Sequence, residues 1–221
     1  MLMKSEREAV LAYSKRLLSS GLVKGSGGNI SLGNPDKSMI AITPSGIVYD
    51  VMTIEDIVIL DLDGNLIEGK RKPTSEMAFH LALQNLRPDI HAVVHTHSDY
   101  ATAMACLGWA LPPVHYLIGY AGNEVPIAPY ATYGTQELSD NICSVIGEGN
   151  AVLMANHGVV CVGSSLDKAF TTAEMVEYVS HLYLLTKSVG DPVILDKHQM
   201  ADVLEKFDSY GQNIKPSKSI Q

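Results

Sequence analysis

The sequence predicts an α/β fold, a single-domain sandwich in which a central mixed, largely antiparallel β-sheet is flanked by helices. Residues 1–221 suit one large α/β domain and contain no repeat or linker that would divide them. The hydrophobic share of 46%, against 18% charged residues, is enough for a sizeable core. Strand-like and helix-like segments mix and are partly joined by hairpin turns, which favours this architecture over a doubly wound parallel sheet.

The first half of the chain begins with a helix-like pattern over residues 5–18 that ends near Gly21. Apolar runs after the glycine-rich segment 25–29 predict strands at residues 30–32, 39–42 and 56–60. Residues 63–65, Asp-Gly-Asn, predict a hairpin turn. A helix should follow to about residue 85, because Thr74 and Ser75 offer cap oxygens and Glu76 suits a first turn.

The second half predicts two buried strands, each rich in apolar residues and each ending at a histidine-containing motif. These strands cover residues 90–97 and 151–155, and residues 159–162 are extended after the second. The predicted helices cover residues 98–107, 166–189 and 196–205. A polar tail ends the chain, and we expect it to be flexible from about residue 211.

The net charge of −8 argues against non-specific nucleic-acid binding, which requires clustered positive charge. The charged first segment does not resemble a signal peptide, and no apolar run is long enough to cross a bilayer. Cys106, Cys143 and Cys161 form no CxxC pair, so we read them as free thiols. These features predict a cytoplasmic protein.

Three histidines predict a metal site. His95 and His97 lie two residues apart at a strand end, where alternate side chains share a face. This pair alone is a weak signal, but His157 ends a second apolar strand and Gly158 permits a sharp turn after it. Three protein ligands with one open position are typical of catalytic zinc. Glu76 is a candidate fourth group, and stabilisation of the helix dipole is its alternative role.

The other histidines give weaker signals. His80 lies one helical turn beyond Glu76, so it could support the site from behind, but helix packing is the favoured interpretation. His115 lies beside Tyr116 without a clear role. We expect surface or packing positions for His91, His181 and His198.

Three segments are suited to binding a phosphate without cationic side chains. Residues 27–29 can present backbone N–H groups, residues 43–46 form a tight turn, and residues 74–75 begin a helix. No Walker A or dinucleotide-binding fingerprint is present, so ATP and NAD are not suggested. Each segment alone could be an ordinary turn or cap. Their combination with three histidines favours a phosphorylated substrate.

The chain resembles the class II aldolase/epimerase family over nearly its whole length. The matching stretches occur in family order and are SGGNIS, AITPSGIVYD, KPTSEMAFH, AVVHTHS, LPPVHYLIGYAGNEVPIAPYATYGTQELSD, ANHGVV and VLEKFDSYG. The resemblance implies the α/β fold above and a zinc-dependent, reversible aldol cleavage. It implies a ketose 1-phosphate substrate, with L-fuculose 1-phosphate expected, and products dihydroxyacetone phosphate and L-lactaldehyde.

The resemblance also implies roles for individual residues. One Zn²⁺ per subunit would be held by His95, His97 and His157, with Glu76 as fourth ligand in the resting state and later as acid or base. A C4 homotetramer is expected, as in the family. In it Tyr116 would act catalytically in the active site of a neighbouring subunit, and Tyr210 in the tail would help close that site. Tyr133 would line the aldehyde pocket. The implied phosphate pocket comprises Gly28, Asn29, Ser45, Gly46, Thr74 and Ser75.

Alternatives remain open within and outside this chemistry. Aldolases for related deoxy-ketose 1-phosphates would share every residue named, and L-ribulose-5-phosphate 4-epimerase or a thioribulose phosphate dehydratase would share the histidines. A non-catalytic aldolase-like scaffold would lack the metal ligands. Thr74 and Tyr133 replace Ser and Phe of the aldolase pattern, and the 119–124 loop is one residue shorter. The last two departures leave the aldehyde preference open.

Overall fold

The computed structural model describes residues 1–209 of the chain. Its strands form one eight-stranded sheet with the order β4-β3-β2-β1-β5-β8-β7-β6. The strands are β1 (Asn29–Gly33), β2 (Met39–Ile42), β3 (Val58–Asp61), β4 (Leu66–Glu68), β5 (Ala92–Thr96), β6 (Ile127–Ala128), β7 (Ala151–Met154) and β8 (Gly158–Gly163). All neighbouring pairs are antiparallel except β6 and β7, which are parallel. The predicted mixed, largely antiparallel sheet is therefore confirmed.

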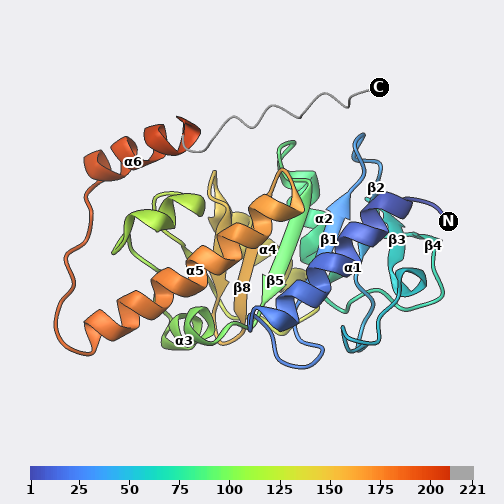
Figure 1. The fold of residues 1–221 in the computed structure, drawn as a ribbon, viewed down its shortest axis with the longest axis horizontal. Coiled ribbons are helices and arrows are strands. Elements are labelled where there is room, and N and C mark those ends of the chain that lie inside the picture. Colours follow the sequence, from blue (N-terminus) through green and yellow to red (C-terminus); the bar gives the residue numbers. More distant parts are fainter. Residues whose placement is uncertain (210–221) are drawn as a thin grey trace, which may run out of the picture.

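Helices cover both faces of this sheet. The helices are α1 (Lys4–Ser19), α2 (Met77–Leu86), α3 (Asp99–Leu107), α4 (Gln136–Ile146), α5 (Leu166–Lys187) and α6 (Lys197–Ser209), with short 3-10 helices η1 (Ile54–Asp56) and η2 (Tyr116–Tyr120). Figure 1 shows α1 and α5 in front of the sheet and α2 and α4 behind it. Each face therefore carries its own apolar core. None of the helices within residues 1–209 has the length and apolar character that a bilayer crossing requires.

The alternation of side chains along the central strands explains the two cores. On β5, Val94 belongs to the core under α1, α3 and α5, whereas Val93 belongs to the core under α2 and α4. On β8, Cys161 belongs to the first of these cores and Val160 to the second. Because β5 and β8 lie in the middle of the sheet, the residues that follow β5 and precede β8 are held from both sides.

Two local predictions differ from the structure, and one helix was not predicted. Asp56 lies outside the strand predicted at 56–60, because its carboxylate accepts hydrogen bonds from the backbone N and Oγ1 of Thr53 at 2.9 and 2.8 Å and closes η1. The helix predicted from Thr74 and Ser75 begins at Met77, and Glu76 occupies its N-cap position without a side-chain cap. Helix α4 was not predicted, although Thr135 caps it by accepting a hydrogen bond from the backbone N of Leu138.

Candidate active site and metal centre

The three predicted histidines come together at the junction of β5, β7 and β8. His95 is on β5 and His97 follows it, and their Nε2 atoms are 2.9 Å apart. His157 lies in the tight turn between β7 and β8. One nitrogen from each ring lies within 4.8 Å of the other two, so one ion can contact all three.

The turn that carries His157 depends on two backbone conformations. Asn156 has a positive φ of 55°, a conformation that asparagine adopts more readily than most residues, and its N–H donates to Ala105 O at 3.1 Å. Gly158 has no room for a side chain, because a Cβ there would lie 2.4 Å from the carbonyl oxygen of Thr96. The turn therefore brings β8 close against β5 and positions the imidazole of His157 beside the other two.

The buried environment keeps the strand histidines neutral. His95 is fully buried, and its Nδ1–H donates to Val159 O at 2.9 Å, so the lone pair of Nε2 faces the site. Burial is the main cause that lowers the pKa of His95 to about 3. Burial also lowers the pKa of His97. Neutral imidazoles are the protonation state that metal binding requires.

Glu76 completes this group from the start of α2. Its Oε2 lies 3.3 Å from His95 Nε2 and accepts a hydrogen bond from Asn29 Nδ2 at 2.8 Å. Its Oε1 lies 3.2 Å from His157 Nε2 and is buried without a hydrogen-bond partner. Burial alone would raise the pKa of Glu76, but His95, His157 and Asn29 together hold it well below its usual value. The side chain is therefore a carboxylate.

This donor set fits a divalent cation. Donor atoms bound tetrahedrally at zinc distances of about 2.0–2.1 Å lie roughly 3.3 Å apart. The carboxylate oxygens of Glu76 lie 3.3 and 3.2 Å from His95 and His157, in accord with that spacing. A buried carboxylate oxygen without a hydrogen-bond partner is costly unless a cation or donor faces it. Three imidazoles and one carboxylate would thus be satisfied by one ion.

A cavity of about 380 Å³ opens beside these groups. It is lined by Ser75, Glu76, His97, Tyr130, Ala131, Tyr133, Asn156 and His157. Tyr133 therefore lies beside the histidines, where sequence analysis expected an aldehyde wall. Tyr130 was missed, although an exposed tyrosine between Pro129 and the glycine at 134 is the kind of loop aromatic that a binding site presents.

The three candidate phosphate segments are joined by hydrogen bonds. The backbone N of Thr43 donates to Ile30 O, and the backbone N of Thr74 donates to Thr43 O, each at 3.0 Å. The backbone N of Ser45 donates to Lys72 O at 3.0 Å. The residues named for the pocket therefore lie on linked segments, and these are Gly28, Asn29, Ser45, Gly46, Thr74 and Ser75.

Glycine is required at position 28. Gly28 has φ +71°, and a Cβ there would lie 2.5 Å from the carbonyl oxygen of His95. The backbone of this segment thus packs directly on the strand that carries His95, and the β1–β5 register places Asn29 opposite His95.

Tyr116 and His115 lie outside the lining of the cavity. Tyr116 begins η2, is half exposed, and its ring lies 6.4 Å from that of Phe207 on α6. It does not line the cavity beside the histidines. His115 has a local role, because its Nδ1 accepts the backbone N–H of Leu117 at 3.3 Å and caps η2. Tyr210 lies outside the described residues.

The structure adds His80 to the site. Its ring is fully buried on α2, and its Nε2 lies 2.5 Å from Asn29 Oδ1 while its Nδ1 lies 2.8 Å from Ser31 Oγ. Burial is the main cause that lowers its pKa to about 3. The four-residue spacing from Glu76 was the only sequence signal, and it does not distinguish a hydrogen-bonded imidazole from a packed one.

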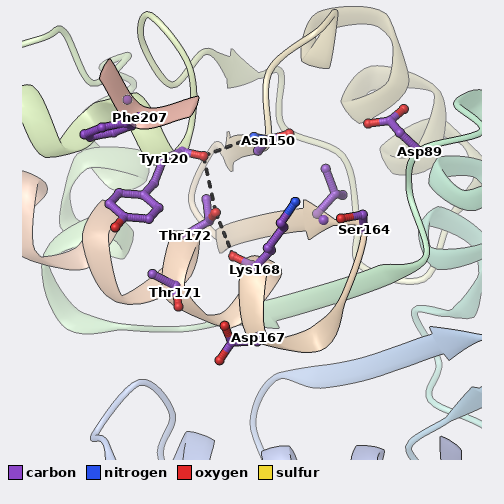
Figure 2. A pocket seen from close by; sticks show the side chains of 12 residues that line it. Asp89, Tyr120, Asn150, Ser164, Asp167, Lys168, Thr171, Thr172 and Phe207 are labelled. Carbon is purple, nitrogen blue, oxygen red and sulfur yellow. Dashed lines mark hydrogen bonds between the residues drawn. The ribbon is translucent and has the colours of Figure 1, made fainter. Parts of the chain in front are cut away.

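A second cavity, of about 540 Å³, lies between η2, β8 and the first turns of α5 (Figure 2). Figure 2 shows Lys168 projecting between Asn150 and Ser164. Asn150 Nδ2 donates to Tyr120 O at 3.1 Å, and Thr172 Oγ1 donates to Lys168 O at 2.9 Å. The lining contains no histidine or cysteine, so the metal-binding chemistry belongs to the smaller cavity.

Comparison with known proteins points to the same chemistry. Residues 8–184 match the family described as Class II Aldolase and Adducin N-terminal domain. The chain is 48% identical to a 5-deoxy-D-ribulose 1-phosphate aldolase of Bacillus thuringiensis serovar kurstaki, over 96% of this chain and 100% of that protein. It is 42% identical to an L-fuculose phosphate aldolase of Escherichia coli K12, over 88% and 90%. A solved L-fuculose 1-phosphate aldolase superposes with a TM-score of 0.92 at 42% identity, covering 94% and 98%.

Proposed function

The chain belongs to the class II aldolase family and is a lyase, and from this premise we propose that it uses zinc to cleave a ketose 1-phosphate. The products would be dihydroxyacetone phosphate and a short aldehyde, and the reaction would be reversible. The observation that carries the proposal is the convergence of three histidines and a carboxylate on a cavity bordered by Ser75.

In cleavage, the bond between C3 and C4 of the ketose breaks. The C4 hydroxyl loses its proton and becomes the aldehyde, while the electron pair remains on C3, which then takes up a proton. His95, His97 and His157 would hold the metal ion, which would act as a Lewis acid and stabilise the negative charge that develops on the ketose oxygens. The expected energetic benefit is several kcal/mol.

Glu76 is the residue that we assign to proton transfer at C3. Its carboxylate faces the cavity and is held by Asn29, so it can deliver or remove a proton at the carbon next to the carbonyl. Its low pKa keeps it in the basic form before substrate binds. The backbone N–H groups of Thr43, Ser45 and Thr74 already donate to carbonyl oxygens. The phosphate group would therefore bind hydroxyl groups and the remaining backbone N–H groups of residues 27–29, 43–46 and 74–75, which fixes the orientation of the reacting carbons.

Tyr116 is assigned to proton exchange at the C4 oxygen. Since it does not line its own subunit's cavity, the assignment requires a neighbouring subunit, as in the C4 homotetramer predicted from the family resemblance. The closing role of Tyr210 remains a prediction. The tetramer has a direct test in mixed subunits. Glu76→Gln and Tyr116→Phe chains, each impaired alone, should gain activity when mixed, because some sites then combine an intact residue of each kind.

The substrate is expected to end in a methyl group. Two candidate substrates share this methyl end. One is L-fuculose 1-phosphate, which the sequence analysis expected. The other is 5-deoxy-D-ribulose 1-phosphate, which appears in the name of the relative at 48% identity. Their aldehyde products are L-lactaldehyde and acetaldehyde. The cavity wall supports such a substrate, because Tyr130, Ala131 and Tyr133 offer apolar surface beside His157. The aldolase named for 5-deoxy-D-ribulose 1-phosphate is 48% identical and matches over 100% of its length, against 42% and 90% for the fuculose phosphate aldolase. We therefore expect 5-deoxy-D-ribulose 1-phosphate to be the better substrate.

A substrate panel tests the proposal. Metal-loaded protein should release dihydroxyacetone phosphate from both ketose 1-phosphates, lose this activity with a chelator, and regain it with zinc. L-ribulose 5-phosphate should not be epimerised, and purified protein should hold about one zinc per chain, unlike a scaffold. Absence of cleavage of every ketose 1-phosphate by the metal-loaded protein would refute the assignment.

A further inference from the structure

A chain of hydrogen bonds leads from the interior of α2 to the carboxylate of Glu76. Gln84 Nε2 donates to Ser31 Oγ at 3.1 Å, and Ser31 Oγ lies 2.8 Å from His80 Nδ1. His80 Nε2 lies 2.5 Å from Asn29 Oδ1, and Asn29 Nδ2 donates to Glu76 Oε2 at 2.8 Å. All five side chains are buried, so no solvent competes for these groups.

The two elements present these side chains because of their regular geometry. Asn29 and Ser31 are two residues apart on β1 and face the same side of the sheet. His80 and Gln84 are four residues apart on α2 and face the same side of the helix. The packing of α2 over the sheet therefore brings two polar pairs into register.

The acceptor at the end of the chain fixes the direction of every bond. A carboxylate only accepts, so the amide nitrogen of Asn29 must face Glu76 and its oxygen must face His80. That oxygen also only accepts, so Nε2 of His80 carries the proton. In a neutral ring Nδ1 then accepts the hydroxyl proton of Ser31, whose oxygen accepts from Gln84. Each bond in the series thus joins one donor to one acceptor.

Resting on the proposed aldolase function, we propose that His80 is a positioning residue that sets the carboxamide of Asn29 and thereby the carboxylate of Glu76. If the amide of Asn29 rotated by half a turn, its oxygen would face the carboxylate and repel it. The Nε2–H donor of His80 opposes this rotation, because it bonds only the oxygen. The bond from Asn29 then holds Glu76 Oε2 within 3.3 Å of His95.

Packing alone does not account for an imidazole at this position. His80 stacks on Phe79 with ring centroids 4.8 Å apart, and an apolar side chain would serve that contact equally well. A buried imidazole with both ring nitrogens hydrogen-bonded can also fix the orientation of the side chains that it contacts. Groups that orient metal ligands in this way typically contribute 10-fold to 100-fold to metal affinity or activity.

Two substitutions of similar length separate positioning from packing. His80→Gln retains an N–H near the Nε2 position, whereas His80→Met fills the space without a donor. We expect His80→Met to weaken zinc binding in chelator competition and to lower kcat by about 10-fold or more, with KM changed much less. We expect His80→Gln to recover most of both losses. Zinc affinity and kcat equal to wild type in a folded His80→Met protein would overturn the proposal.

A measurement on the unsubstituted protein covers the case in which His80→Met fails to fold. With ¹⁵N-labelled histidine, the ring of His80, assigned by its loss in His80→Gln, should be neutral with the proton on Nε2. A proton on Nδ1 would overturn the proposal whether or not His80→Met folds. If wild type cleaves no ketose 1-phosphate, the proposed function fails separately, because zinc affinity and the tautomer still test the positioning role.

Discussion

Acidification of the metal-free protein should remove about 3 kcal/mol of folding stability through His80 alone. The imidazole is fully buried, and burial lowers its pKa from 6.5 to about 3 in the folded protein. In the unfolded chain the same ring titrates near 6.5. Between these values the unfolded state binds a proton that the folded state does not, so stability falls as the pH falls. The slope approaches about 1.4 kcal/mol per pH unit, and pH 4.5 lies two units below 6.5.

Urea unfolding at pH 7.0 and 4.5 measures this effect. Protein concentration must stay fixed, because any oligomerisation contributes to apparent stability. The loss of unfolding free energy between the two pH values should be about 3 kcal/mol larger for wild type than for His80→Gln, since all other groups are shared. His198→Gln is the control for removing a histidine that lies in solvent. Equal pH dependence in wild type and His80→Gln would refute the reasoning.

Four further changes probe the site and its support. Glu76→Gln should keep the three imidazole ligands but slow hydrogen exchange at the reacting carbon of dihydroxyacetone phosphate by about 100-fold or more, and unchanged exchange would remove Glu76 from its role. Gly158→Ala places a methyl group 2.4 Å from a carbonyl oxygen of β5, so metal content and cleavage should both be lost; one metal ion per chain would contradict this. Tyr116→Phe should slow cleavage with near-normal KM, whereas an unchanged rate would indicate another acid. Arg7→Met removes a buried guanidinium that donates hydrogen bonds to the backbone oxygens of Leu2 and Ile57. The free energy of unfolding in urea should fall by about 3 kcal/mol, and Lys4→Met is the control for an exposed cation. A loss below about 1 kcal/mol for Arg7→Met would contradict the prediction.

The cluster of three histidines was predictable because its signals are local. Alternation along β5 places His95 and His97 on one side without knowledge of any partner strand. His157 beside Gly158 marks a turn after an apolar run, and the glycine proves to be required by the close approach of β5. The sequence pattern also predicted the mixed sheet, since hairpins and apolar runs are short-range features.

What escaped prediction depends on contacts between distant segments. The bond between Asn29 and Glu76 requires the β1–β5 register together with the packing of α2, and neither is written in a local pattern. The sequence pattern places Asp56 at the start of a strand, yet its capping interaction with Thr53 keeps it in the 3-10 helix η1, before β3 begins. Helix α4 was a different kind of omission, because a threonine cap followed by apolar residues at four-residue spacing was present in the sequence.

Asn29 connects the two halves of the proposed site. Its carboxamide nitrogen carries two N–H groups, and the bond to Glu76 Oε2 uses one of them. In the predicted phosphate role the second N–H would donate to a phosphate oxygen, which does not conflict with the observed bond. Both depend on the same orientation of the amide, which the Nε2–H of His80 determines. A buried histidine without access to substrate can therefore influence both substrate binding and proton transfer, through one carboxamide.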